Sequence, residues 1–286
     1  MQREPVVAGM FYPANPAHAR AEVARMIDDA RQVVPAGDFF AGLVPHAGWA
    51  YSGPTAARTF AALATSGTPN ALVIFGAVHT WGVGQPALYG QGSWETPLGP
   101  LQVDHVLAEA ILREAGRNVS QSERAHSEEH SIEVQLPFVK YLWPDATIVP
   151  LMVPPEPRAP AVGEAVARAV KAYPGRVFLL GSSDLTHYGP RYGFAPRGVG
   201  PTALAWAKEN DRRLLDDVLH LRAEEIVPRA AADRSACGGG AIAATVAAAR
   251  ALGATKGILL EHTTSYEVQP IGRPEDFVGY AAVVFS

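Results

Sequence analysis

Short apolar runs rich in β-branched residues, each separated from the next by a helical pattern, constrain the fold of this chain most. The runs cover residues 39–44, 71–75, 147–153, 177–180, 257–261 and 280–285. Helices are expected near residues 17–33, 54–64, 104–115, 128–142, 160–172, 202–219 and 240–252. Strands that are continuously apolar, rather than alternating, are typical of a sheet covered by helices on both faces. We therefore predict an α/β sandwich with a central, mostly buried sheet flanked by helices.

The 286 residues are enough for one such domain with a sizeable core. The proline-rich stretch at residues 153–157 is the best candidate for a domain boundary, but strands are expected on both sides of it. No internal repeat and no Gly/Ser linker interrupts the chain. We therefore predict a single domain over residues 1–286.

Charge and composition exclude several classes of protein. Lys and Arg number 24 against 28 Asp and Glu, a net charge of −4, which argues against nucleic-acid or anionic-membrane partners. The single cysteine rules out an intramolecular disulfide. No signal-peptide pattern follows the first residues, and the apolar runs are too short to span a bilayer. We expect a cytoplasmic protein, and the sequence does not determine its oligomeric state.

Three histidines stand at similar positions after expected strands. His46, His79 and His187 each follow a different apolar run, and Asp184 lies three residues before His187. A lone histidine after a strand is usually a loop or core residue. In open α/β sheets, however, ligands bind just beyond the carboxyl ends of the strands, and imidazole is the commonest metal ligand. The shared placement favours a metal site formed from several strand ends.

Cys237 is the only thiol and precedes three glycines at the start of the expected helix 240–252. A lone cysteine is most often a small buried apolar residue. A helix N-terminus also lowers the pKa of a thiol, and glycines allow a ligand to approach closely. The glycine run could instead form an anion-binding nest. These readings stay open at this point.

Residues 126–130 have the sequence His-Ser-Glu-Glu-His, which matches the H-x-x-E-H pattern of inverted zinc peptidases. In that reading His126 and His130 bind zinc from one helical face, Glu129 activates water, and Glu209 is a candidate third ligand. A second reading is a solvated first helical turn capped by Ser127. A third reading gives the segment a secondary place in an active site.

Six motifs occur in an order that resembles the Memo family, whose bacterial members include the AmmeMemoRadiSam system protein B. They are Ala8–Pro13, Pro45–Gly48, Thr96–Gly99, His126–Pro137, Ser182–Asp184 with His187, and Cys237–Gly238. The resemblance extends from about residue 3 to residue 285. Because this family is similar in fold to the class III extradiol dioxygenases, the resemblance implies one α/β domain around one strand-end site.

The resemblance also implies roles for individual residues. His46, His79 and Cys237 match the metal ligands, and His187 matches the acid/base histidine of the related dioxygenases, with Asp184 beside it. Those dioxygenases bind Fe(II) with two histidines and one carboxylate, whereas this chain has Cys237 at the third position. A thiolate leaves open positions on iron and raises the affinity for copper and zinc.

We therefore expect a mononuclear metal, Fe(II) first and copper or zinc as alternatives. The expected function is a redox enzyme that acts with O2 on a small hydroxylated or aromatic substrate. Tyr51, Glu129 and His130 are the expected substrate-binding residues, and His187 and Asp184 the catalytic ones. The alternative is a non-catalytic protein that retains the fold and binds a metal, or a peptide, in the same cleft.

Overall fold

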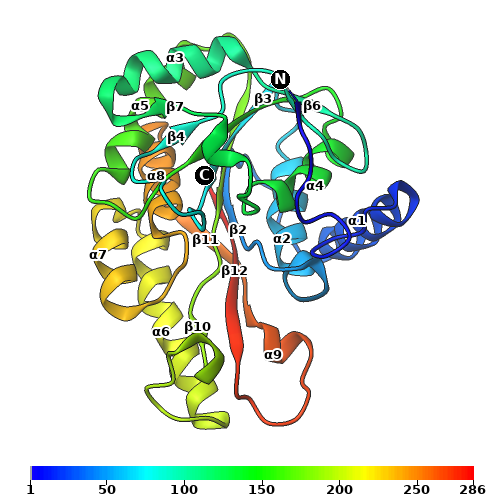
Figure 1. Ribbon diagram of the computed structural model, residues 1–286, viewed down its shortest axis with the longest axis vertical. Coiled ribbons are helices and arrows are strands. Elements are labelled where there is room, and N and C mark those ends of the chain that lie inside the picture. Colours follow the sequence, from blue (N-terminus) through cyan, green and yellow to red (C-terminus); the bar gives the residue numbers. More distant parts are fainter. Residues whose placement is uncertain (1) are drawn as a thin grey trace.

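The computed structural model describes residues 2–286, and its centre is one large sheet (Figure 1). The strands are β2 (Ala41–Val44), β3 (Ala71–Gly76), β4 (Ala87–Leu88), β7 (Ser120–Gln121), β8 (Thr147–Met152), β9 (Val177–Ser182), β10 (His187–Tyr188), β11 (Gly257–Thr264) and β12 (Phe277–Phe285). Their order is β10-β12-β2-β9-β3-β8-β4-β7, with β11 paired to β12. The four central strands, β2, β9, β3 and β8, are parallel. A small second sheet contains β1 (Gln2–Arg3), β5 (Ser93–Trp94) and β6 (Leu101–Gln102).

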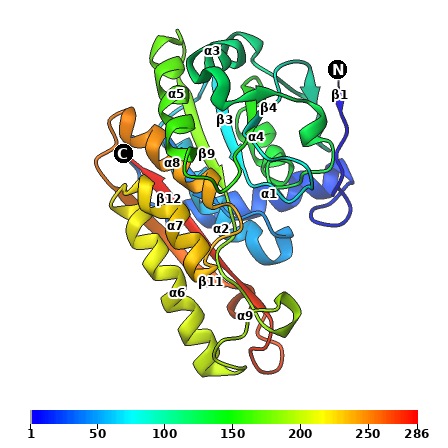
Figure 2. The same ribbon diagram turned by 60° about the vertical axis from the view of Figure 1, so that its left-hand side comes forward.

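Helices cover both faces of the central sheet, as Figures 1 and 2 show. One face carries α1 (Pro16–Arg31), α2 (Trp49–Ala64) and α4 (Leu136–Leu142). The other carries α3 (His105–Ala115), α5 (Ala159–Ala172), α6 (Pro201–Leu219), α7 (Ala223–Asp233) and α8 (Gly239–Ala251). The short α9 (Ser265–Val268) follows β11 at the lower end of the molecule. This arrangement confirms the predicted α/β sandwich.

Strand β3 shows why the central runs are apolar at every position. Val73 and Phe75 belong to the core shared with α3, α5 and α8. Leu72 and Ile74 belong to the core shared with α1, α2 and α4. Because successive side chains of a strand point to opposite faces, a strand with a helical layer on each side needs apolar residues throughout.

The start of α8 is held by close packing around glycines. A Cβ atom on Gly240 would lie 2.1 Å from the carbonyl oxygen of Pro154, and one on Gly163 of α5 would lie 2.0 Å from that of Ala244. Only glycine permits backbones to approach this closely. The contacts fix the position of α8, and Cys237 lies two residues before its first residue.

The expected helix over 128–142 is wrong in its first half. Residues 124–126 and 133–135 form single 3-10 turns, and α4 begins only at Leu136. The carboxylate of Glu129 accepts hydrogen bonds from the backbone N–H groups of His130 and Ser131. A side chain that takes up backbone donors in this way competes with helix formation.

Helix α2 begins at Trp49, five residues before the expected start, and contains Pro54. Proline has no N–H to donate, so the carbonyl of Ala50, one turn earlier, loses its helical partner. That carbonyl accepts a hydrogen bond from Gln269 Nε2 at 3.2 Å instead.

Helix α7 was not predicted from the sequence. Within residues 2–286, no helix combines the length and apolarity needed to cross a membrane.

Candidate metal centre

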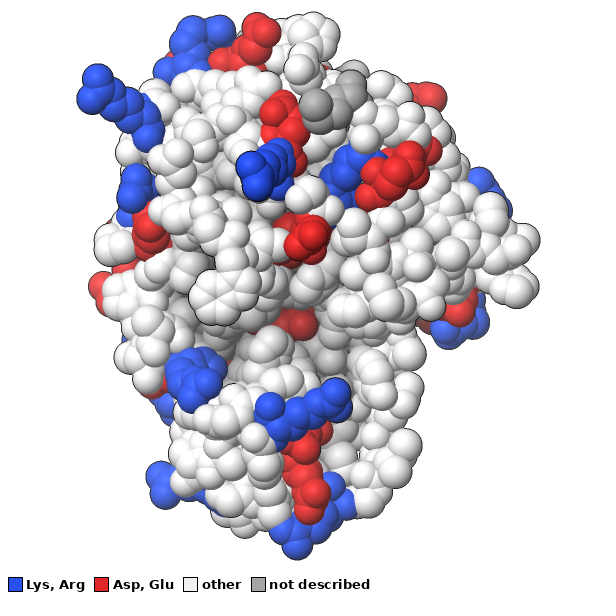
Figure 3. All heavy atoms as spheres, viewed as in Figure 1, with Lys and Arg blue, Asp and Glu red and all other residues white. Residues whose placement is uncertain are grey.

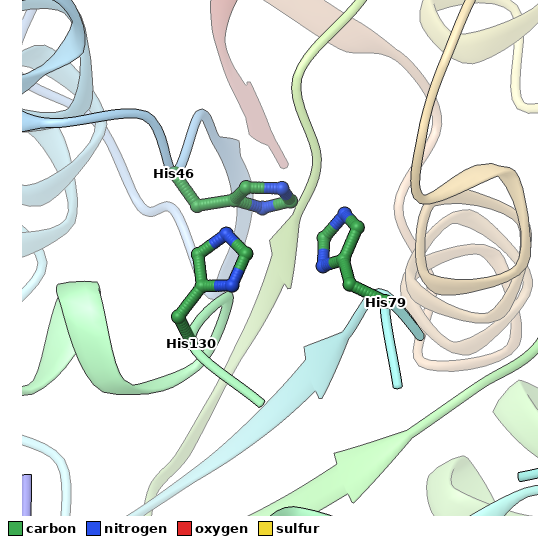
Figure 4. A group of neighbouring side chains, drawn as sticks. All are labelled: His46, His79 and His130. Atoms are coloured by element: carbon green, nitrogen blue, oxygen red, sulfur yellow. The ribbon is translucent and has the colours of Figure 1, made fainter. Parts of the chain in front are cut away.

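Adjacent parallel strands bring distant parts of the chain to one point. His46 follows β2, Asp184 follows β9 and His79 follows β3, and these three strands are neighbours in the sheet. His130 reaches the same point from the turn before α4, and the three imidazoles face one another (Figure 4). One ring nitrogen from each of His46, His79 and His130 lies within 4.8 Å of the other two. The three histidines could therefore hold a metal ion.

Cys237 lies next to the histidine cluster, where its position just before α8 brings it. Its Sγ is 3.2 Å from His46 Nε2 and 3.8 Å from Ser183 Oγ. The backbone N–H of Cys237 donates to the carbonyl of Asp184, which ties the start of α8 to the end of β9. The thiol predicted as the third ligand thus contacts His46, one of the two predicted histidine ligands, whereas the third member of the clustered group is His130.

The hydrogen bonds of Ser182 decide which nitrogen of His46 faces the cluster. Ser182 Oγ donates to the carbonyl of Ser131 at 2.7 Å. Because a hydroxyl has one hydrogen to donate, its oxygen accepts from Gln135 Nε2 at 3.2 Å and from His46 Nδ1 at 3.1 Å. His46 therefore carries a proton on Nδ1, and Nε2, the nitrogen that would bind a metal, is turned toward the cluster.

Glu129 orients the ring of His79 in the same way. Its carboxylate is fully buried and can only accept, so His79 Nδ1 donates to Oε1 at 3.0 Å, while the backbone N–H of His79 donates to Oε2 at 2.6 Å. Nε2 of His79 is therefore the nitrogen that would bind a metal. This placement differs from the predicted substrate contact of Glu129, because the carboxylate lies behind His79 and does not line the cleft.

The charges in the cluster depend on one another. Burial alone would raise the pKa of Cys237, but the neighbouring charge of His46 and hydrogen bonds from His46 and His79 lower it to about 5. Burial opposes protonation of His79, but hydrogen bonds to Cys237 and Glu129 raise its pKa to about 10. Burial and the charges of His46 and His79 lower the pKa of His130 to about 4. The cluster therefore pairs a thiolate with imidazolium protons, which a bound cation would displace.

Beside the cluster lies a cleft of about 810 Å³, which we call the metal cleft. Figure 3 shows a hollow between the upper and the lower part of the molecule. The predicted site residues on its wall are His46, Tyr51, His79, His130, Asp184 and His187. His187 Nε2 is 3.8 Å from Asp184 Oδ2, and its ring stacks on Tyr192 with centroids 5.2 Å apart. Tyr51 is 42% exposed at the rim.

His126 lies outside this cluster, so the H-x-x-E-H reading is wrong in its geometry. Its Nε2 contacts the carbonyl of Ala87 at 3.0 Å, and its ring lies edge-on to Tyr89 and Trp94. Burial lowers its pKa to about 4. Without a helix over residues 126–130, the two histidines do not share a face, and only His130 joins the metal-ligating group found within residues 2–286.

Sequence reasoning missed two parts of the site. Nothing marked Ser182 and Gln135 as the residues that orient His46, because their roles depend on a contact between segments far apart in sequence. His130 was expected to contact substrate, and its approach to His46 and His79 had no local signal once a helix was assumed there.

Comparison with known proteins finds relatives over the full length of this chain. The family model described as "Memo-like protein" matches residues 3–284. A MEMO1 family protein of Thermococcus onnurineus is 37% identical over 100% of this chain and 99% of its own length. One from Pyrococcus abyssi is 38% identical over 99% of each chain.

A solved structure is similar in fold. The crystal structure of an uncharacterised protein from Escherichia coli K12 covers 87% of this chain and 100% of its own, with a TM-score of 0.55 and 12% sequence identity. The full-length family match and the end-to-end identity to curated relatives are decisive. The chain belongs to the Memo family.

Proposed function

We propose that this chain binds one transition-metal ion in the metal cleft and is a mononuclear non-haem iron, or copper, redox enzyme. The observation that carries the proposal is the orientation of His46 and His79. Each donates Nδ1–H to a buried partner, Ser182 or Glu129, and each turns its Nε2 toward the same point. Imidazoles fixed by such hydrogen bonds are the usual form of protein metal ligands.

The donors fit a transition metal better than Mg²⁺ or Ca²⁺, which prefer oxygen ligands. We take Cys237 as the third ligand, since its Sγ is 3.2 Å from His46 Nε2 and its pKa of about 5 makes it a thiolate at neutral pH. Two histidines and one thiolate leave coordination positions for small molecules. Iron or copper bound there would supply electron transfer between an organic ligand and O2.

His187 is the proposed acid/base group. Burial alone would lower its pKa, but the nearby carboxylate of Asp184 and the charge of Cys237 raise it above the ordinary value. Its ring stacks on Tyr192 at the cleft wall, so a bound ligand would meet it directly. We propose that it takes or returns the proton of a small hydroxylated or aromatic substrate, with Tyr51 and His130 as further walls.

One observation favours the alternative, a metal-binding protein without turnover. Beside the three clustered histidines, Cys237 contacts His46 and offers a fourth potential donor. Four protein ligands would close a tetrahedral site, which is typical of structural metals, whereas three leave a catalytic position open. The number of protein ligands therefore separates the two functions.

The test combines anaerobic metal analysis with an assay of O2 consumption on catechol. The enzyme proposal predicts iron or copper near one equivalent and measurable turnover. His187→Ala should keep its metal and lose about 100-fold or more of the rate, as acid/base groups do. Cys237→Ala should lose the metal, and His130→Ala should keep most of it.

Different results would favour other sites. Metal without O2 consumption, together with loss of metal from the His130→Ala variant, would favour the closed, non-catalytic site. Loss of metal from His187→Ala with full occupancy in Cys237→Ala would mean that the ligand and the base are exchanged.

A further inference from the structure

We propose that Arg3 is a positioning residue of the metal centre, which it reaches through the backbone of the segment that carries Glu129 and His130. The inference rests on the proposed metal binding in the metal cleft. It adds the N-terminal strap, residues 3–12, to the parts of the chain that build that site. The strap lies far from His46, His79 and Cys237 in sequence.

Contacts outside the metal centre hold Arg3 in place. It is only 6% exposed, and its guanidinium carbon lies 4.0 Å from the ring centroid of Trp94. Its backbone pairs with Trp94 in parallel, and its carbonyl accepts the N–H of Glu95 at 2.8 Å. The side chain therefore points inward from a fixed strand, where its donors need buried acceptors.

All of the strongest acceptors of Arg3 lie in one segment, residues 126–133. Nε donates to the carbonyl of His126 at 2.8 Å, and Nη2 donates to the carbonyl of Glu129 at 2.6 Å. Nη1 forms an ion pair with Glu133 Oε2 at 2.9 Å. Because the guanidinium is a rigid planar fork, these bonds fix the three acceptors relative to one another.

The fixed segment contains the groups that the metal centre needs. Glu129 is bound by Arg3 at its carbonyl and by His79 at its carboxylate, so a shift of its backbone moves the partner of His79. His130 is the next residue, and its N–H donates to the carboxylate of Glu129 at 2.9 Å. The stretch between Arg124 and Leu136 consists of turns, so contacts with other parts of the chain hold it in place. Arg3 binds its first part, and Ser182 of β9 and Trp49 of α2 bind the carbonyls of Ser131 and Val134.

The strap contacts the same segment at its other end. Glu133 accepts two backbone N–H groups of the strap and the hydroxyl of Tyr12, each at 2.9 Å. The ring of Phe11 lies edge-on to His130, with centroids 5.0 Å apart. Arg3 and Phe11 thus hold the segment from two sides, at its carbonyls and at its imidazole.

Substitution of Arg3 separates this role from a contribution to stability alone. Arg3→Lys keeps a positive charge for Glu133 but loses the fork that reaches both carbonyls. Arg3→Met loses both. Arg229→Met is the matched control, because Arg229 pairs with Asp217, whose side chain is 2% exposed, on the far helical layer.

The measurement is an anaerobic titration with Co²⁺ that is monitored by visible absorption. This absorption responds to the number and geometry of the metal ligands. Thermal unfolding is measured on the same samples. We expect Co²⁺ to bind Arg3→Lys and Arg3→Met about tenfold more weakly than wild type, the lower end of the effect for groups that orient ligands, with an altered spectrum. Arg229→Met should unfold at a lower temperature and bind Co²⁺ as wild type does.

Arg3→Lys alone decides the question if Arg3→Met does not fold. Wild-type affinity and an unchanged spectrum in Arg3→Lys would overturn the inference while the proposed function stands. Equal weakening in Arg229→Met would overturn it too, since general loss of stability would then explain the effect. If wild type binds no Co²⁺, the proposed function fails, and the inference fails with it.

Discussion

The carboxylate of Glu129 grips His79 at two points, with its Oε1 3.0 Å from the ring Nδ1 and its Oε2 2.6 Å from the backbone nitrogen. The hydrogen bond with His79 and neighbouring backbone donors overcome the effect of burial and hold the pKa of Glu129 well below its usual range. The buried carboxylate therefore stays charged, and it fixes the ring of His79 with Nε2 turned toward the cluster.

Glu129→Gln tests this grip. The ring and the backbone nitrogen of His79 donate to different oxygens of Glu129. An amide has one oxygen and one NH₂ group, so one of these two positions would carry a donor in place of an acceptor. We expect metal affinity to fall by about 10- to 100-fold, the usual effect of losing a residue that orients a ligand. Titration with a competing chelator measures it. Glu128→Gln, at the exposed neighbouring position, is the control and should bind metal as wild type does. Equal affinity of the two variants would contradict the account.

His126 predicts a loss of stability in mild acid. Burial lowers its pKa to about 4 in the folded protein, whereas the ordinary value is 6.5. The unfolded chain therefore takes up the proton first, and stability falls as the pH drops from above 6.5 toward 4, by about 1.4 kcal/mol per pH unit from this group.

Denaturant unfolding of wild type and His126→Gln, at about pH 7 and about pH 5, checks this prediction. Glutamine can donate to the carbonyl of Ala87 but does not titrate. The stability of wild type should fall by about 2 kcal/mol more than that of the variant between these two conditions. Parallel pH dependence in the two proteins would show that His126 does not carry the effect.

Gly240→Ala tests the packing that places Cys237. The added Cβ would lie 2.1 Å from the carbonyl oxygen of Pro154, so α8 must shift at its first turn. We expect a loss of about 1–3 kcal/mol of unfolding free energy, as for other overpacked sites, together with weaker metal binding. Gly84→Ala is the control, since nothing lies within 4 Å of its added Cβ. An unchanged stability of Gly240→Ala would mean that the helix start is less constrained than the contact implies.

The sequence predicted the layers of the fold because strands such as β3 are buried on both faces, which their apolar residues reveal directly. It also placed His46, His79 and Asp184 at strand ends, and adjacent parallel strands then brought them together. The order of strands was not predictable from the runs themselves, because the pairing of β9 between β2 and β3 joins segments far apart in the chain.

The segment before α4 shows where local reasoning stops. The i, i+4 spacing of His126 and His130 indicated one helical face, but buried hydrogen bonds of Glu129 and the guanidinium of Arg3 hold the backbone in turns. As a result His126 packs against Trp94 while His130 faces the metal cleft. Contacts of this kind depend on tertiary structure and leave no periodic trace in the sequence.

The central claim is that His46 and His79 bind one transition-metal ion in the metal cleft. Metal content of protein purified without oxygen, measured by mass spectrometry on wild type, His46→Ala, His79→Ala and the exposed control His18→Ala, tests it most directly. The account predicts close to one iron or copper ion per chain in wild type and in the control, and loss of most of it in both site variants. Full metal content in His46→Ala and His79→Ala would contradict it.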